Sequence, residues 1–479
     1  MLRLLALALL LLTSCHPPGQ RAEEQSLQDL GYAVGFGLEN PQGEQPSAPA
    51  DQEPRPRIEL DPDFDIFEDD EAETELGAPF TQQLLDERVA LILPRVEEIR
   101  GMNFQHEVPA GLQSADEFIE FAMDDFEQEY GMETFQAMAE AYRLLGLIDP
   151  ELDLFETTME LLRGQVGGYY DPRTKRFYMI DSFGQGATAD IILAHELTHA
   201  LDDQHFDLQS LMEGAETADR EFAVRAVVEG SGTSLMNLYA VRGALSGWLE
   251  LDPAAMMAEM EGQADSLEAA PPYLVMSLAL PYMEGNKFLT RKANMIEATM
   301  TPPTDADLRA AFANPPRSSE QVLHFEKYWD PEQADEPVPV STDFVLATLG
   351  EGWKLEHSDT LGELACFVVT AEQLPDLTTA AGQMNGRWTN AAATGWGGDR
   401  YASCTGPGGA RVLVWETVWD READAVEFAV ALKRDPAPKN IFLRAVDLDG
   451  KRVRAVYANP AGEAQVAALI DAAPTPSQD

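Results

Sequence analysis

Three residues within a run of five, His195, Glu196 and His199, have the types and spacing of a metal-dependent hydrolytic site. Because an α-helix has 3.6 residues per turn, side chains at positions i and i+4 leave the same face one turn apart. Two imidazole nitrogens placed in this way suit one tetrahedral Zn²⁺ ion. Glu196 would lie beside the metal, where it can take a proton from a metal-bound water. The pattern predicts a catalytic zinc site, and the alternative is a buried helix whose histidines fall at this spacing by chance.

A catalytic zinc ion needs a third protein ligand and an open position for water, and the sequence offers two candidates. His205 lies ten residues after His195, where the H-E-x-x-H-x-x-G-x-x-H pattern of metzincins has its last histidine. That pattern turns the chain sharply at a glycine, and this chain has Asp202 there, which adopts the left-handed conformation less readily. Glu229 lies in a second predicted helix, residues 219–233, and would complete a His₂Glu site. These observations favour Glu229 over His205.

The elements that must position these residues can be read from the flanking sequence. Residues 187–205 are expected to form the helix that carries the motif, with Thr188 or Asp190 capping its start. Helical periodicity over residues 80–163 predicts a helical subdomain before it. Residues 165–180 predict a hairpin, which either binds an extended peptide by main-chain pairing or merely packs on the helix.

Composition limits the kinds of partner. The chain has 479 residues and a formal net charge of −50, so binding to nucleic acid is not expected. We expect a signal peptide over residues 1–14, a disordered acidic tether over 15–78, a metallopeptidase domain over 79–335 and a C-terminal domain over 336–479.

The N-terminus predicts export and lipidation. Residues 1–15 have one arginine, an apolar run too short to cross a bilayer and small residues that end at Cys15, as in a bacterial lipobox. Cleavage before Cys15 and lipidation of its thiol would place the protein at the bacterial cell envelope, membrane-bound through its lipid anchor. The alternative is an ordinary signal peptide with an incidental cysteine. In an oxidising compartment, Cys366 and Cys404 are expected to form a disulfide, with two free thiols as the alternative.

The C-terminal region mixes strand and helix patterns, so we predict an α+β fold there. Short runs at residues 344–347, 411–418 and 452–457 predict strands, whereas 421–432 and 463–470 predict helices. Residues 447–450 predict a hairpin turn rather than a calcium loop.

Several segments together resemble a family of secreted bacterial gluzincin-like (HExxH…E) zinc metallopeptidases, mostly uncharacterised. The similar segments lie at residues 167–172, 195–208, 225–233, 280–288 and 315–328, with weaker similarity at 360–364 and 395–401. The resemblance implies a mainly helical, zincin-like domain, with His195, His199 and Glu229 as zinc ligands and Glu196 as the base. The family usually has an acidic residue two positions after the third ligand, where this chain has Ser231.

Four further residues are candidates for supporting roles. Asp203, one turn beyond His199, is expected to accept the free N–H of a ligand imidazole or else to be a surface charge at the helix end. If it is not a ligand, His205 would close the helix end near the site. Tyr282 and His324 lie in segments shared with the family and are candidate donors to an oxyanion, against ordinary packing or loop roles.

The function predicted from these residues is zinc-dependent hydrolysis of peptide bonds in a protein or peptide substrate at the cell envelope. Three alternatives remain open: a non-catalytic zinc-bound envelope lipoprotein that serves partner binding, a non-peptidase hydrolase acting on envelope material, and a metzincin-like peptidase that uses His205.

Overall fold

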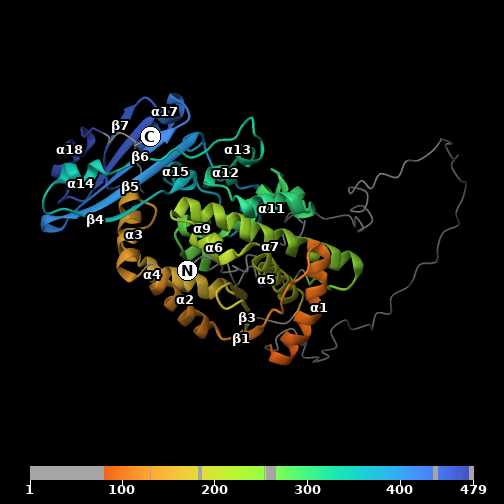
Figure 1. Ribbon diagram of the computed structural model, residues 1–479. Coiled ribbons are helices and arrows are strands. Elements are labelled where there is room, and N and C mark those ends of the chain that lie inside the picture. The colour runs from red at the N-terminus through yellow and green to blue at the C-terminus, as the bar shows by residue number, and fades with distance from the viewer. Residues whose placement is uncertain are drawn as a thin grey trace, which may run out of the picture. The chain divides into compact units, whose positions relative to one another are not determined.

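The computed structural model describes residues 80–129, 131–181, 186–252, 254, 266–434 and 441–473, which belong to one compact unit. The predicted signal peptide (1–14), Cys15 and the whole predicted tether (15–78) lie outside the described residues. The described chain has an α+β fold, as predicted, with one sheet of three strands and one of five (Figure 1).

Helices dominate the first part of the described chain, as the periodicity predicts. They are α1 (Gln82–Arg100), α2 (Ala115–Glu129), α3 (Met132–Leu145) and α4 (Leu154–Gln165). Gly146 ends α3 in the left-handed conformation, which glycine adopts without strain. The apolar faces of α2, α3 and α4 bury residues in one shared core cluster.

The predicted hairpin forms and gains a third strand. Strand β2 (Gly168–Asp171) pairs antiparallel with β3 (Arg176–Ile180). Strand β1 (Ala110–Gln113) pairs with β3 in parallel on its other side, so the order is β1-β3-β2. Strand β2 is therefore an edge strand, and it packs against the helix that follows the hairpin.

That helix, α5 (Ala187–Phe206), carries the predicted metal motif and is buried over most of its length. Its N-cap is Gly186, which makes no side-chain capping bond, so the prediction of a cap at Thr188 or Asp190 is wrong. Both residues are buried inside the first turns, and Asp190 pairs with Arg88 of α1 at 3.4 Å. The helix is surrounded by other elements, and packing sets its start more than local capping does.

Two long helices form the centre of the molecule. Helix α7 (Ala218–Ser246) follows the short α6 (Leu208–Glu213) and packs against both α5 and α9 (Pro272–Thr290) (Figure 1). Where α7 and α9 cross, a Cβ on Gly230 would lie 2.3 Å from the carbonyl carbon of Gly285. Glycine at both positions lets the two backbones approach closely, and this crossing fixes the part of α7 that contains Glu229.

The C-terminal sheet has the order β4-β5-β6-β8-β7, and all its neighbouring strands are antiparallel. Its strands are β4 (Lys354–Asp359), β5 (Trp396–Gly406), β6 (Ala410–Trp419), β7 (Leu443–Asp449) and β8 (Arg452–Ala458). The strand predictions at 411–418 and 452–457 are confirmed, and residues 447–450 lead into the turn between β7 and β8. Residues 344–347 form part of a helix, α14 (Phe344–Leu349), so the strand prediction there is wrong.

Helices connect and cover this sheet. Between α9 and the sheet lie α10 (Met295–Met300), α11 (Asp305–Ala313), α12 (Ser319–Leu323) and α13 (Glu326–Trp329). Helices α15 (Gly362–Thr370), α16 (Ala380–Asn385), α17 (Glu422–Leu432) and α18 (Val466–Ile470) complete the described chain. The predicted helix over 421–432 is confirmed as α17, and that over 463–470 forms a 3-10 turn followed by α18.

The two faces of the five-stranded sheet belong to different cores. Tyr401 and Trp415 join a large cluster that also contains residues of α3, α7 and α9, whereas Ala402 and Val414 face a smaller cluster with α14 and α18. The large cluster draws residues from both sides of position 335. The predicted boundary between 335 and 336 is therefore not a break between separate cores.

The alternation of side chains along the sheet also overturns the predicted disulfide. Cys366 of α15 belongs to the large cluster, whereas Cys404 of β5 belongs to the smaller cluster on the opposite face. Because successive side chains of a strand point to opposite faces, the sheet lies between the two sulfur atoms. Both cysteines are buried free thiols.

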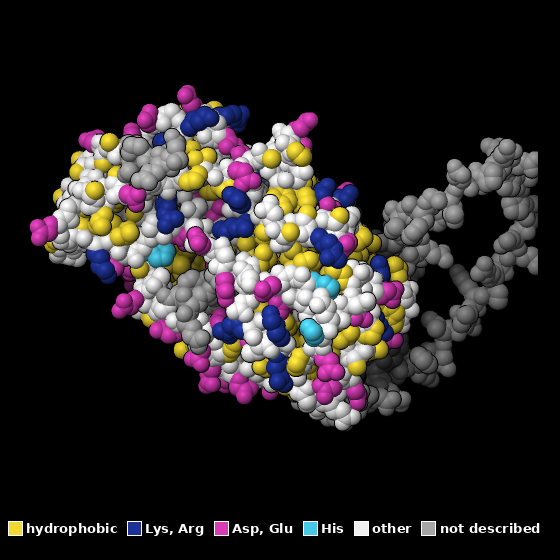
Figure 2. All heavy atoms as spheres, viewed as in Figure 1, with side chains coloured by type: hydrophobic (Ala, Val, Ile, Leu, Met, Phe, Trp, Pro, Cys, Tyr) yellow, Lys and Arg dark blue, Asp and Glu magenta, His cyan; other side chains and the backbone are white. Residues whose placement is uncertain are grey.

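The surface carries many carboxylates. Figure 2 shows acidic side chains spread over one face, with small groups of Lys and Arg between them. Among the described helices, none combines the length and the hydropathy needed to cross a bilayer.

Candidate metal centre

Three side chains from two helices meet at one point in the buried centre of the molecule. The Nε2 atoms of His195 and His199 lie 2.9 Å apart, and each lies 3.3 Å from Oε2 of Glu229. The side chains of His195, His199 and Glu229 are 3%, 1% and 0% exposed. The two histidines come from consecutive turns of α5, and Glu229 comes from the middle of α7.

A small residue allows α7 to come this close to α5. A Cβ on Gly232 would lie 2.6 Å from Cε1 of His195, closer than real Cβ atoms approach a ring. Gly232 therefore leaves the space in which the imidazole lies, one turn along α7 from Glu229. Because α7 lies this close to α5, the carboxylate of Glu229 can face both histidines.

The distances between these atoms fit the demands of a zinc ion. Tetrahedral ligands at 2.0–2.1 Å from a common centre lie about 3.3 Å from one another. Both distances between a histidine and Glu229 have this value, and the distance between the histidines is shorter. The donor set, two imidazole nitrogens and one carboxylate oxygen, is one that catalytic zinc sites use.

The charges of the three groups depend on one another. Burial opposes ionisation of Glu229, but the two histidines outweigh it and lower the pKa of Glu229 to about 2. Burial likewise opposes protonation of His199, but Glu229 outweighs it and raises the pKa of His199 to about 9. Burial and His199 together lower the pKa of His195.

Glu196 follows the first histidine and is completely buried. Burial raises the pKa of Glu196 to about 8. The backbone N–H of Tyr170 is directed toward the Glu196 carboxylate and acts to lower its pKa, but neither carboxylate oxygen has a side-chain hydrogen-bond partner within the described part of the chain. A buried carboxyl group without a side-chain partner is costly, and a group of this kind beside a cluster of ligands is typical of acid–base catalysis.

The ring of Tyr282, from α9, stacks on that of His195, with centroids 5.7 Å apart and planes inclined by 19°. Tyr282 is 1% exposed and belongs to the large core cluster. The structure therefore places Tyr282 beside the candidate metal site, as predicted, where its ring packs on that of His195.

A second layer of charge lies behind the three candidate ligands, and it is formed by Asp202 and not by the predicted Asp203. Asp202 is fully buried, its Oδ1 accepts a hydrogen bond from Arg100 at 2.5 Å, and its Oδ2 accepts one from Ser231 at 2.5 Å. Its negative charge helps to raise the pKa of His199. Ser231, at the position where the similar family is usually acidic, therefore donates to an acidic residue contributed by α5. Arg100 and Asp202 were missed because they lie far apart in sequence.

Asp203, the residue predicted to orient a ligand imidazole, has other partners. It accepts the hydroxyl proton of Tyr170 at 2.7 Å, and it pairs with Lys175 at 2.8 Å. It also accepts the backbone N–H of Leu208. Asp203 therefore links α5 to the hairpin and to the start of α6, and the prediction that it binds a ligand histidine is wrong.

His205 does not join the cluster. Its Nε2 lies 2.9 Å from the backbone oxygen of Asn103, and its Nδ1 lies 3.3 Å from the side-chain nitrogen of Gln105. These contacts attach the end of α5 to the segment after α1. The structure therefore does not support the metzincin-like arrangement. It also does not place His205 beside His195, His199 and Glu229.

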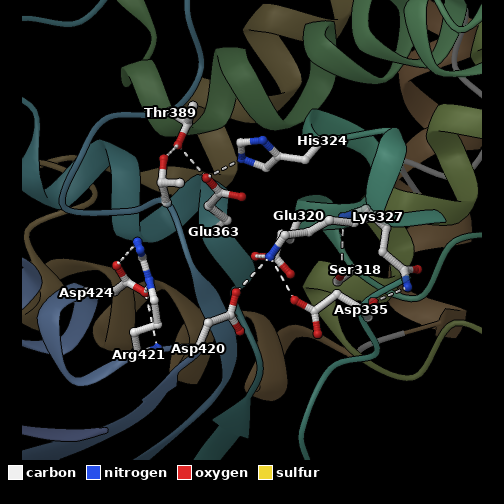
Figure 3. A network of polar contacts seen from close by, with 12 residues as sticks. Ser318, Glu320, His324, Lys327, Asp335, Glu363, Thr389, Asp420, Arg421 and Asp424 are labelled. Atoms are coloured by element: carbon white, nitrogen blue, oxygen red, sulfur yellow. Dashed lines mark hydrogen bonds and ion pairs between the residues drawn. The ribbon is translucent and has the colours of Figure 1, made fainter. Parts of the chain in front are cut away.

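His324, the second candidate oxyanion donor, belongs to a separate polar network, shown in Figure 3. Its Nε2 lies 3.0 Å from Oε1 of Glu363, and the hydroxyl of Thr389 donates to the same oxygen. Glu363 is fully buried in α15. The candidate role of His324 at the metal cluster is not supported, because its ring is directed toward this carboxylate.

The same figure shows a second group of carboxylates that could hold a cation, formed by Glu320, Asp335 and Asp420. The ammonium group of Lys327 already lies between them, 2.6, 2.8 and 2.9 Å from their oxygens. Burial opposes its charge, but the carboxylates hold the pKa of Lys327 well above its usual range. The group is therefore an internal ion-pair network that joins α12, α13 and the end of β6, and not a metal site.

Comparison with known families gives a match in the C-terminal part of the chain. Residues 351–469 match the model of a domain of unknown function (DUF8575). The matched residues run from β4 to α18 and exclude His195, His199 and Glu229. Comparisons with curated proteins and with solved structures return no match.

Proposed function

We propose that this protein is a zinc-dependent metallopeptidase of the zincin-like kind, with His195, His199 and Glu229 as the residues that hold the metal. The proposal rests on one observation: two imidazole nitrogens and a carboxylate oxygen converge at ligand-like distances beside a buried glutamate that has no side-chain hydrogen-bond partner among the described residues. A bound Zn²⁺ would supply Lewis acidity and a water of lowered pKa.

The residues around the metal have distinct roles in this proposal. Glu196 accepts the proton of the attacking water and then transfers a proton to the leaving amine, for which a carboxyl group with a raised pKa is suited. Tyr282 keeps the ring of His195 in place by stacking and is the candidate donor to the oxyanion. Asp202 holds negative charge near His199 and favours its interaction with a cation.

Strand β2 is the candidate site for an extended substrate. It is an edge strand, it packs on α5, and the hydroxyl of Tyr170 fixes it to Asp203. Edge strands can bind an added peptide strand through main-chain hydrogen bonds. A protein or peptide substrate bound along β2 would run beside the helix that carries Glu196.

The burial of all three ligands also favours a second candidate, a non-catalytic zinc protein of the envelope. Structural zinc sites are closed, whereas catalytic sites keep an open position. Glu196 has a role only in the catalytic candidate, because a structural zinc site needs no buried carboxyl group beside the metal.

Metal analysis together with turnover distinguishes the two candidates. The wild type should contain one equivalent of zinc and cleave a denatured protein such as casein, and a chelator should abolish cleavage. The variants His195→Ala and Glu229→Ala should lose the metal. Glu196→Gln should retain the metal and lose activity by about 10²- to 10⁴-fold. If Glu196→Gln cleaves like the wild type, the catalytic role is wrong; if no variant changes the metal content, the ligand set is wrong.

We also propose that the protein is anchored at the cell envelope through lipid on Cys15, on the basis of the lipobox-like residues before it. Expressed in bacteria, the wild type should fractionate with membranes and Cys15→Ser should not. Equal recovery of both proteins in the soluble fraction would contradict the anchor.

A further inference from the structure

A cavity lies one helical turn along α7 from the site formed by His195, His199 and Glu229. It has a volume of about 410 Å³ and is enclosed by α3, the start of α7, the start of α9 and the segment between β4 and α15. This volume is within the range of small-molecule sites. His195, His199 and Glu229 are not among the described residues that line it, so the cavity is distinct from the metal cluster.

Apolar side chains form most of the wall. Those that matter here are Phe126, Phe135, Met138, Leu154, Phe222 and Leu274. Four of them come from the first helices and two from α7 and α9. A ligand that fills this space must therefore carry apolar groups, because polar groups placed there would lose their hydrogen bonds to water.

One buried cation interrupts this apolar wall. Arg225 is 3% exposed, and its Nε and Nη2 have no hydrogen-bond partner among the described residues. Its Nη1 makes a single long contact, 3.4 Å, with the backbone oxygen of Ser277. An arginine keeps its charge at any physiological pH, and burying an unpaired charge is costly. Glu221, one turn earlier on α7, also lines the cavity, but no ion pair joins Arg225 to a carboxylate among the described residues. A carboxylate fits the two free donor positions of the guanidinium group.

The residues at the rim indicate the kind of carboxylate. Four carboxylates line the cavity, the exposed Glu213 and Glu216 and the half-buried Glu221 and Asp359, so anionic groups surround its apolar interior. A simple fatty acid would gain nothing from these carboxylates. A peptide has N–H groups, or an ammonium group, that can pair with them while its C-terminal carboxylate reaches Arg225.

We propose that this cavity binds a short apolar peptide, or the apolar C-terminal end of a longer one, by pairing its terminal carboxylate with Arg225. The apolar side chains of the peptide occupy the space between α3 and α7, and its amino end faces Glu213 and Glu216. This binding does not depend on hydrolysis at the metal cluster, and it adds a recognition site for chain ends to the molecule.

Calorimetric titration of the full-length Glu196→Gln protein tests the proposal without turnover. The probes are the dipeptide Leu-Phe, its C-terminal amide and decanoate. Leu-Phe should bind, and the amide should bind about 10- to 100-fold more weakly because it loses a charge-assisted pair. Equal binding of the acid and the amide would overturn the proposal, and tighter binding of decanoate than of Leu-Phe would show a fatty-acid site instead.

Variants then locate the binding. Arg225→Gln should abolish the preference for the free acid, whereas Arg242→Gln, an exposed arginine of the same helix, should leave it unchanged. Should Arg225→Gln fail to fold, Met138→Trp fills the cavity from its half-buried wall and should abolish binding of both peptides. His195→Ala should bind Leu-Phe as the parent does, and loss of binding in that variant would place the peptide at the metal cluster and overturn the proposal.

Discussion

Gly232 of α7 faces the imidazole of His195 so closely that a methyl group in place of its hydrogen would lie 2.6 Å from the ring. The position of this histidine therefore depends on a residue 37 positions later in the chain, which has no side chain of its own. The relation explains why the second helix can supply Glu229 to the same point.

Gly232→Ala should therefore reduce metal affinity by displacing His195, in addition to destabilising the fold by about 1–3 kcal/mol through overpacking. Gly243→Ala, on the same helix, is the matched control, since its new methyl group would collide with Leu249 and Trp248 and not with the histidine. Both variants should unfold at lower urea concentration, but only Gly232→Ala should release zinc more readily to a competing chelator. Equal zinc retention by the two variants would show that the histidine adjusts to the methyl group.

The hydroxyl of Ser231 donates to Asp202, and this predicts the effect of placing an acidic residue at position 231. Ser231→Asp would place a second carboxylate against Asp202 in a fully buried site and should destabilise the protein by about 3 kcal/mol or more. Ser231→Ala removes only the hydrogen bond and should cost about 2 kcal/mol. Urea unfolding measures both, and an aspartate variant at least as stable as the alanine variant would contradict this account.

The motif on α5 could be predicted because its geometry is local. The i, i+4 spacing of His195 and His199 requires only that the segment be helical, and the flanking residues are good helix formers. Glu229 was harder to predict as a ligand from the sequence, because 29 residues separate it from His199 and no local geometry fixes the distance between the two side chains. A second helix of suitable polarity and the resemblance to a known family together identified it, and the structure places it 3.3 Å from both rings.

The predictions that failed are those that depended on tertiary neighbours. Asp203 lies one turn from His199, yet Tyr170 and Lys175 from the hairpin determine its partners. The strand predicted for residues 344–347 is a helix, because a short apolar run has no period of its own and packing decides its form. Cys366 and Cys404 form an even pair in the sequence, but they lie on opposite faces of the sheet, whose strand β5 with Cys404 was not predicted.

The two buried thiols should therefore remain reduced. Burial raises the pKa of Cys366 well above its usual range and that of Cys404 to about 12, so neither forms the reactive thiolate near neutral pH. A soluble Cys15→Ser protein, purified without reductant, should show no reaction with DTNB when native and two reactive thiols in guanidinium chloride. Absence of thiols in the unfolded protein would indicate a disulfide and would contradict the sheet arrangement.

The pair formed by His324 and Glu363 predicts a dependence of stability on pH. Burial opposes protonation of the ring, but the hydrogen bond and charge of Glu363 outweigh burial and raise the pKa of His324. The charge of Glu326 adds a smaller increase, and that of Lys327 opposes it. A histidine whose pKa is higher in the folded than in the unfolded state binds its proton more tightly when folded. Its contribution to stability is complete below about pH 6.5, its unfolded value, and is lost as the pH rises through the folded value.

His324→Gln keeps a donor for Glu363 but cannot titrate, so it isolates this effect. Urea unfolding of both proteins between pH 5 and pH 9 should show the largest advantage of the wild type at the acidic end of the range. The advantage should shrink as the pH rises above 6.5, and it should lose its pH dependence when Glu363→Gln is introduced into both proteins. A difference between the wild type and His324→Gln that stays constant across this range, or that grows with pH, would show that the ring is neutral in the folded protein and that Glu363 does not hold its proton.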